Sequence, residues 1–231
     1  VQTIDFGLNN RPPVNTVPGV QTVAEDAAGG LNITGVSVTD PDGNLQTTQL
    51  SVGAGNLNVS LAGGATISAG ANGSGTLTLS GTQAQINAAL ATLNYQSPAN
   101  FNGSTILTVV STDKVGQQDT DTVAINVTAV NDPPVNTLPA SYTTSEDTSV
   151  ALTGLSIADI DAASGTMTVT LNVGSGTVTA SSGGGVTVAG SGSGTITLTG
   201  TLANLNAFLA STAPVFNPAA NANGPVTLTM T

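Results

Sequence analysis

The chain has 231 residues, with two cationic residues against 13 carboxylates and a formal net charge of −11, and it contains no cysteine, histidine or tryptophan. The missing cysteine and histidine exclude disulfides, thiolate or imidazole catalysis and zinc sites of the usual kind. Because Arg11 and Lys114 are the only basic residues, the chain has too little positive charge to bind nucleic acid or to be held at an anionic membrane.

The N-terminal stretch already belongs to a repeat. Val1–Leu8 aligns with Thr122–Ala129, and the block Asn10–Pro18 returns 121 residues later as Asn131–Pro139. A period of this length indicates two copies of one module. We expect residues 1–8 to be the last strand of a preceding repeat, residues 9–130 to form repeat 1, and residues 131–231 to form repeat 2 without its last strand. Either the sequence is a window cut from a longer repetitive chain, or one subunit supplies this strand to its neighbour.

Short segments that alternate apolar and polar residues follow along the chain, separated by Gly, Asn or Pro. They are Leu31–Val38, Thr76–Ser80, Thr105–Val109 and Val123–Val127. Alternation with turns at this spacing is typical of sandwich strands. The sequence therefore predicts an all-β protein of tandem Ig-like or cadherin-like Greek-key sandwiches.

One segment per module departs from this alternation. Ile86, Leu90 and Leu93 are spaced by four and three residues behind a possible N-cap at Thr82, and Thr201–Leu209 repeats the pattern. This spacing predicts one short amphipathic helix in each module, with its apolar face on the core.

The acidic residues recur with the repeat. Eight of the 13 occupy equivalent positions in the two modules. They are Glu25, Asp26, Asp40 and Asp42, with their partners Glu146, Asp147, Asp159 and Asp161. Such regular placement indicates a specific role for these carboxylates, and all eight are candidate metal ligands.

The pairs Asp40/Asp42 and Asp159/Asp161 suggest a cation site. On an extended segment, residues two apart point to one side, and we expect no lysine or arginine beside them. Calcium suits such a site because it accepts six to eight oxygens from carboxylates, amides and carbonyls. The alternative is that Asp-Pro-Asp-Gly at 40–43 is a simple β-turn.

Other acidic residues have less definite assignments. Asp26 and Asp147 could be further ligands or could accept main-chain hydrogen bonds in a turn. Asp119 and Asp121 are expected in a solvated loop.

The order of these blocks resembles that of cadherin-like repeats. Thr108–Asp113, Gly116, Thr122–Val127 and Asn131–Pro134 are similar to the end of such a repeat, and the bacterial versions in large secreted RTX-type and biofilm adhesins are the more similar. The resemblance implies calcium at the junctions between repeats. Glu25, Asn131, Asp132, Asp159 and Asp161 would serve one junction, with Asn10, Asp40, Asp42 and Asp113 at the upstream one. Arg11 stands where the second junction has Asp132, which makes the upstream site the weaker.

The sequence thus favours a structural protein rather than an enzyme. We expect extender repeats of an adhesin, secreted or on a bacterial surface, with neighbouring repeats and possibly further copies as partners and Ca2+ as the bound ion. Two alternatives remain open at this point: a self-assembling filament or layer subunit, and a carbohydrate-binding or ice-binding module with Thr76/Thr78 and Thr195/Thr197 on its face.

Overall fold

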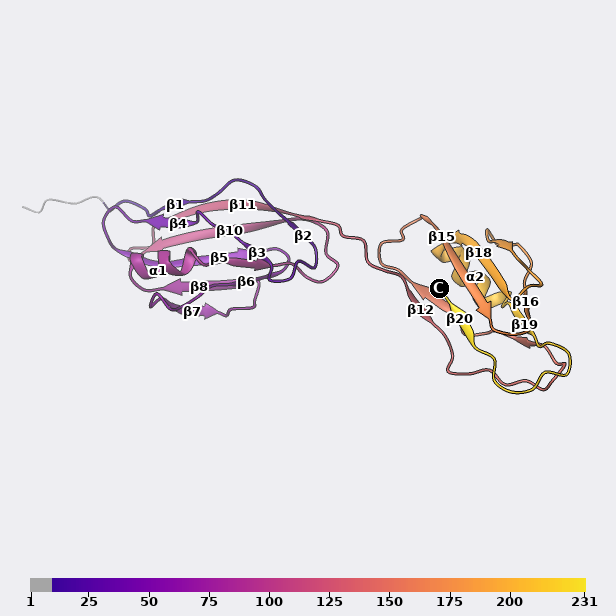
Figure 1. Ribbon diagram of the computed structural model, residues 1–231. Helices are drawn as coiled ribbons and strands as arrows, with labels where there is room; N and C mark the ends of the chain where they lie inside the picture. Colours follow the sequence, from indigo (N-terminus) through magenta and orange to yellow (C-terminus); the bar gives the residue numbers. More distant parts are fainter. Residues whose placement is uncertain (1–9) are drawn as a thin grey trace, which may run out of the picture. The chain divides into compact units, whose positions relative to one another are not determined.

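The computed structural model describes residues 10–231, which form two compact units (Figure 1). The first unit ends at Val130 and the second spans Asn131–Thr231, so the division falls where the sequence repeat begins its second copy. The strand expected at residues 1–8 lies outside the described residues. The all-β fold class is confirmed, because the described residues form mainly β-sheets, with one short helix in each unit.

The first unit is a sandwich built around a six-stranded sheet with the order β2-β11-β10-β5-β8-β7. β11 lies between β2, to which it runs parallel, and β10, to which it runs antiparallel. A three-stranded sheet β3-β9-β6 and the pair β1-β4 complete the unit. The strands are β1 (Val14–Thr16), β2 (Gln21–Ala24), β3 (Leu31–Asn32), β4 (Ser37–Thr39), β5 (Leu45–Val52), β6 (Asn56–Asn58), β7 (Thr66–Gly70), β8 (Thr76–Ser80), β9 (Asn94–Gln96), β10 (Gly103–Asp113) and β11 (Gln118–Thr128).

Apolar residues from both layers meet in one core. Leu50, Leu107 and Ile125 come from the large sheet, and Leu57 and Tyr95 come from the three-stranded one; all are fully buried. Alternate positions of each strand supply these residues, as the pleat of a half-exposed strand requires. Burial of this shared apolar surface is the main force that holds the layers together.

The second unit repeats this plan with shorter strands. Its sheets have the orders β17-β18-β15-β20, β13-β19-β16 and β12-β14. No strand of the second unit corresponds to β11. The strands are β12 (Val135–Thr137), β13 (Val150–Ala151), β14 (Ser156–Ala158), β15 (Thr166–Val173), β16 (Thr177–Thr179), β17 (Thr187–Ala189), β18 (Thr195–Thr201), β19 (Val215–Asn217) and β20 (Leu228–Met230).

Each unit contains the expected helix. α1 (Gln83–Leu90) begins after Thr82, whose hydroxyl accepts a bond from Gln85 N, while the Gln85 side chain bonds back to Thr82 N. This reciprocal pair satisfies two main-chain donors that a helix start leaves open. α2 (Leu202–Ser211) is capped by Thr201 in the same way through its hydroxyl. Neither helix is long and apolar enough to cross a membrane.

One expected strand is wrong in its extent. Leu31–Val38 is divided into β3 and β4, which pair in different sheets. Gly35 lies between them at φ +84°, a left-handed conformation that ends an extended segment. The alternation of apolar residues continues across this break because both strands face the same core.

Candidate metal-binding carboxylates

Asp113 is the most buried carboxylate among the described residues of the first unit, with no exposed surface. Its Oδ1 accepts bonds from the main-chain nitrogens of Val115 (2.9 Å) and Gln117 (2.8 Å), and its Oδ2 accepts one from Asn10 Nδ2 (2.5 Å). Burial acts to raise the pKa of Asp113, but the bonds from Asn10 and from the Gln117, Val115 and Gly116 main chain outweigh it and lower that pKa. The group is therefore a carboxylate held in a fixed orientation.

Asp40 and Asn44 join the same cluster. Asp40 is 6% exposed, and its Oδ1 accepts bonds from the main-chain nitrogens of Asp42 (2.9 Å) and Asn44 (3.3 Å). The Asn44 side chain donates to Asn10 Oδ1 (2.5 Å). The predicted residues Asn10, Asp40 and Asp113 are thus brought together with Asn44, which the sequence did not single out as a ligand. The sequence signal that could have identified Asn44 as a ligand is its position, four residues after Asp40 in a polar turn.

The expectation of an extended Asp40–Asp42 segment is wrong. Residues 41–43 form a turn, closed by the bond from Gly43 N to Asp40 O (3.2 Å) and by the Asp40 side chain. Aspartate favours this arrangement because its short side chain can accept a bond from the main chain two residues on. The alternative interpretation of Asp-Pro-Asp-Gly at 40–43 as a β-turn is therefore correct for the local backbone.

Asp42 also differs from expectation, because a cation compensates it. Its Oδ1 lies 3.3 Å from Arg11 Nη2, and its Oδ2 accepts a bond from Arg11 N (2.6 Å). Asp42 is exposed, so the ion pair adds little stability. It does reduce the negative charge of this end of the unit.

The second unit reproduces this arrangement with one change of charge. Asp161 Oδ2 accepts a bond from Asp132 N (2.6 Å), and Asp159 Oδ1 accepts one from Asp161 N (2.9 Å). These bonds match those of Arg11, Asp42 and Asp40 position by position. Asp132 therefore adds a carboxylate where the first unit has a guanidinium. Beside it, Asn131 Nδ2 donates to Asp132 O (3.0 Å).

Glu25 lies at the end of the first unit where β11 leaves the sheet. The side chain follows β2 and is 2% exposed, and its Oε1 accepts a bond from Val130 N (2.8 Å). Its Oε2 is buried and accepts no hydrogen bond from the residues that the structure describes. A buried acceptor without a donor is uncommon and destabilising, so this oxygen requires an explanation.

Glu146, the counterpart of Glu25, is exposed. Asp26 and Asp147 are at equivalent places in the two units. Asp26 Oδ1 accepts from Asn100 N (3.1 Å), and Asp147 Oδ1 accepts from Asn221 N (2.8 Å). Both aspartates therefore accept main-chain hydrogen bonds in loops, which is one of the two roles expected for them.

Asp119 and Asp121 lie in β11 and not in a loop. Asp119 Oδ2 accepts a bond from Asn15 N (2.7 Å), and the Asn15 side chain donates to Asp119 O (3.0 Å). Sequence reasoning placed the start of this strand too late, because polar residues with exposed or half-exposed side chains interrupt the apolar pattern.

Within residues 10–231, no group of three or more acidic side chains gathers closely enough to hold a metal by itself. The clusters instead combine one or two carboxylates with amide and main-chain oxygens. Calcium accepts such mixed oxygen donors. The assignment of calcium to these residues remains a prediction.

Comparison with known proteins gives a partial family match. The family model described as Protein GAMETE EXPRESSED 2 domain matches residues 33–122, which is less than half of the chain and lies within the first unit. A search of curated proteins found no match.

Several solved structures, which include cadherin domains, are similar to the chain. Cadherin domains 1–5 of protocadherin gamma B2 match at 14% identity and a TM-score of 0.35, over 84% of this chain and 32% of that one. Domains 1–3 of protocadherin gamma C5 match at 19% and 0.34, over 83% and 58%. The human desmocollin-1 ectodomain matches at 16% and 0.31, over 96% and 36%. The chain thus spans about a third of the first of these structures, and likeness at these scores does not determine its function.

Proposed function

We propose that the chain consists of two extender repeats of an extracellular adhesion protein, on or released from a bacterial surface, and that calcium stiffens the chain where one repeat follows another. The ion would be held by Glu25, Asn131, Asp132, Asp159 and Asp161. In this proposal the chain acts as a spacer, and the metal ion offsets the electrostatic repulsion between the carboxylates.

The observation that carries the proposal is the unsatisfied oxygen of Glu25. Oε1 is bonded to Val130 N, one residue before Asn131, while Oε2 is buried without a hydrogen-bond donor among the described residues. A buried acceptor that lacks its donor costs about 1–3 kcal/mol. A cation beside Oε2 would remove this cost, and the Asn131-Asp132 pair follows immediately in the chain.

The charge difference between the two repeats supports the same conclusion. The guanidinium of Arg11 compensates Asp42, whereas the equivalent position next to Asp161 carries the carboxylate of Asp132. Carboxylates that lie close together repel each other and favour a bound divalent cation. The site that includes Asp132 should therefore bind calcium more tightly than the upstream cluster.

The donor chemistry agrees with calcium. Asn131 and Asn10 can turn their amide oxygens toward an ion, because amide oxygen and nitrogen differ only by rotation of the side-chain group. Oxygen donors from carboxylates, amides and main-chain carbonyls are those that calcium takes at about 2.3–2.6 Å. Magnesium requires a tighter octahedron and serves as the control ion.

Thermal unfolding and small-angle scattering of the chain test the proposal in calcium, magnesium and EDTA. Calcium should raise the melting temperature, since an ion that binds only the folded state stabilises it by linkage. In the scattering experiment it should increase the length of the chain or narrow the distribution of its dimensions. Identical melting and scattering in calcium and EDTA would overturn the proposal.

Glu25→Gln is the informative variant. Without metal it should leave stability unchanged or raise it, because it replaces a buried charge by a neutral amide that keeps an acceptor for Val130 N. In calcium it should lose most of the metal-dependent stabilisation. Glu146→Gln is the matched control, because Glu146 is exposed and the change there should not alter the calcium response.

A further inference from the structure

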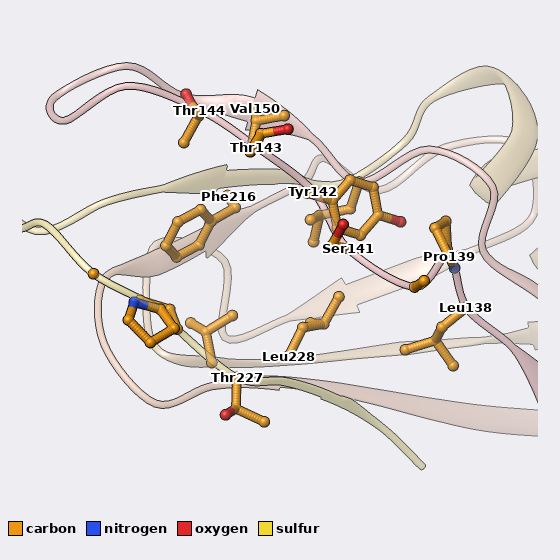
Figure 2. Close-up of a pocket in the computed structure, with 16 residues that line it drawn as sticks. Leu138, Pro139, Ser141, Tyr142, Thr143, Thr144, Val150, Phe216, Thr227 and Leu228 are labelled. Carbon is orange, nitrogen blue, oxygen red and sulfur yellow. The ribbon is translucent and has the colours of Figure 1, made fainter.

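The second unit contains a cavity of about 540 Å³, lined mainly by the segments 138–144 and 224–228 (Figure 2). In Figure 2 the side chains of Tyr142, Phe216 and Leu228 lie around this space. None of the described residues that line the cavity is charged, so it lacks the carboxylates that would hold a cation. The charged side chains of each unit lie elsewhere, and at one position their sign differs between the two repeats.

The acidic cluster of the first unit comprises Asn10, Asp40, Asp42, Asn44 and Asp113. Asp113 accepts two main-chain bonds through Oδ1 and one bond from Asn10 Nδ2 through Oδ2. Asn10 Oδ1 accepts a bond from Asn44 Nδ2. Asp40 Oδ1 accepts bonds from the main-chain nitrogens of Asp42 and Asn44. Among the described residues, no buried side-chain oxygen of this cluster lacks a hydrogen-bond partner, so the protein's own donors satisfy it without an ion.

Arg11 brings a positive charge to the open side of this cluster. Its Nη2 lies 3.3 Å from Asp42 Oδ1, and its main-chain nitrogen donates to Asp42 Oδ2 at 2.6 Å. The other cation of the chain, Lys114, directly follows Asp113 but makes no ion pair within residues 10–231. The guanidinium of Arg11 therefore occupies a carboxylate oxygen that a metal ion would need, and its charge opposes the approach of a cation.

Residue 132 holds the same place in the second unit with the opposite charge. Asp132 N donates to Asp161 Oδ2 at 2.6 Å, as Arg11 N does to Asp42 Oδ2. Within each aspartate pair the second residue donates its main-chain N–H to Oδ1 of the first, at 2.9 Å in both units. The backbone is thus the same at residues 11 and 132, and the side chain beside the aspartate pair changes from a cation to an anion.

We propose that this position is a charge switch that determines whether a repeat takes a divalent cation, and that Arg11 takes the place of the ion in the first unit. The calcium-binding state of the switch, with Asp132, rests on the proposed function. The metal-free state rests on the contacts of Arg11 and of the acidic cluster alone. Repeats with a cation at this position would keep their arrangement in calcium-free solution, and repeats with an anion would respond to calcium.

The chemistry of arginine suits the metal-free state. A guanidinium keeps its charge at every physiological pH, and its planar set of donors matches a carboxylate. The side chains of Arg11 and Asp42 are 64% and 29% exposed, so the ion pair contributes little to the stability of the fold. Its effect is on the binding of ions, because a change from cation to anion at contact distance should alter the affinity for a divalent ion by about tenfold or more.

Reciprocal substitutions in the full chain, Arg11→Asp and Asp132→Arg, test the proposal. Hydrogen exchange of main-chain amides, measured by mass spectrometry with calcium and with EDTA, locates the response in the segments 40–44, 113–117 and 159–161. In the parent, calcium should slow exchange at 159–161 and leave the other two segments unchanged. Arg11→Asp should gain protection at 40–44 and 113–117 at millimolar calcium, the range of extracellular modules. Asp132→Arg should bind calcium about tenfold or more weakly at 159–161.

Lys114→Asp is the matched control, because it makes the same change of charge next to the cluster at a residue without an ion pair. It should gain no calcium protection, and a gain equal to that of Arg11→Asp would overturn the proposal by showing that net charge alone is responsible. Calcium protection of 40–44 in the parent, or none in Arg11→Asp, would also overturn it. Exchange in EDTA that matches the parent shows that each variant is folded.

The same experiment separates this proposal from the proposed function. If 159–161 shows no calcium response in the parent while Arg11→Asp gains one at 40–44, calcium binding by the second unit is excluded and the role of Arg11 is supported. If 159–161 responds in the parent and the response is unchanged in Asp132→Arg, calcium binding is supported and the charge switch is overturned.

Discussion

The main-chain nitrogen of Asp132 donates a hydrogen bond to Asp161 Oδ2 at 2.6 Å, and Arg11 makes the same bond to Asp42 at the same distance in the first repeat. The two repeats thus conserve the backbone geometry while the charge of the donor residue is reversed. The contact is common to both units, whereas the change from guanidinium to carboxylate alters the charge beside it.

Asp161→Asn is expected to remove most of the calcium-dependent stabilisation of the second unit. The asparagine oxygen can still accept the bond from Asp132 N, so stability in EDTA should change little. An ion present at 100 times its dissociation constant adds about 2.7 kcal/mol, which sets the size of the effect that is lost. Denaturant unfolding in calcium and in EDTA measures the difference.

Tyrosine fluorescence can assign this effect to one unit. The chain has two tyrosines and no tryptophan, with Tyr95 in the first unit and Tyr142 in the second. In a Tyr95→Phe background, Tyr142 reports unfolding of the second unit alone. Asp42→Asn is the matched control, since Arg11 already compensates Asp42; equal loss of calcium response in both variants would contradict the assignment.

The local features of the fold could be predicted from the sequence. β8 and both helices were expected correctly because strand alternation, helical spacing and a threonine cap are each encoded within a few residues. The division of Leu31–Val38 was missed because Gly35 is compatible with a strand and its φ of +84° is imposed by the pairing of β3 and β4 with different partners.

The candidate site was predictable in its residues but not in its contacts. Recurrence of the acidic blocks identified Asp40, and the resemblance to cadherin-like repeats identified Asp113. Yet Arg11 meets Asp42 across 31 residues and Glu25 meets Val130 across 105. Contacts at such separations depend on strand order and register, which the local pattern does not encode.

Asp113 should make the first unit sensitive to acid. Its pKa is lowered in the folded state, while an unfolded aspartate titrates at about 3.9. A depressed pKa gives stability that is fully present above the unfolded value and is lost as the pH falls through the folded value. The melting temperature of the first unit should therefore fall as the pH is lowered below about 3.9.

Asp113→Asn tests this assignment, because it removes the titrating group and keeps a side chain of the same shape. The variant should be less stable than the parent at neutral pH, and the difference should shrink at low pH, as Asp113 becomes protonated in the parent. Asp121→Asn, on the same sheet, is the control for the loss of one negative charge. A stability difference that is independent of pH would show that Asp113 acts through packing alone.

Gly30→Ala should destabilise the first unit strongly. Gly30 has a φ of +66°, and a Cβ there would lie 2.3 Å from the carbonyl oxygen of Tyr95. We expect a loss of about 3 kcal/mol or more, because left-handed strain and a clash with main chain combine. Gly29→Ala separates the two effects: Gly29 has a φ of +87° with nothing within 4 Å, so it should lose about 1–2 kcal/mol. Equal losses in the two variants would exclude the clash.

Tyr95→Phe should leave the first unit as stable as before, or raise its stability by up to about 1 kcal/mol. Tyr95 is fully buried, and its hydroxyl has no hydrogen-bond partner among the described residues. Burial also raises its pKa, so the phenol should resist ionisation in the folded protein at alkaline pH. Phe216 stands at the equivalent position of the second unit, pairing with Val150 as Tyr95 pairs with Leu31.

Denaturant unfolding measures the change in the stability of the Tyr95→Phe variant. Tyr95→Ala is the control that shows whether the site is sensitive to packing, and it should lose about 3–5 kcal/mol. A loss above about 1 kcal/mol in Tyr95→Phe would mean that the hydroxyl bonds to a buried water or to a residue outside 10–231.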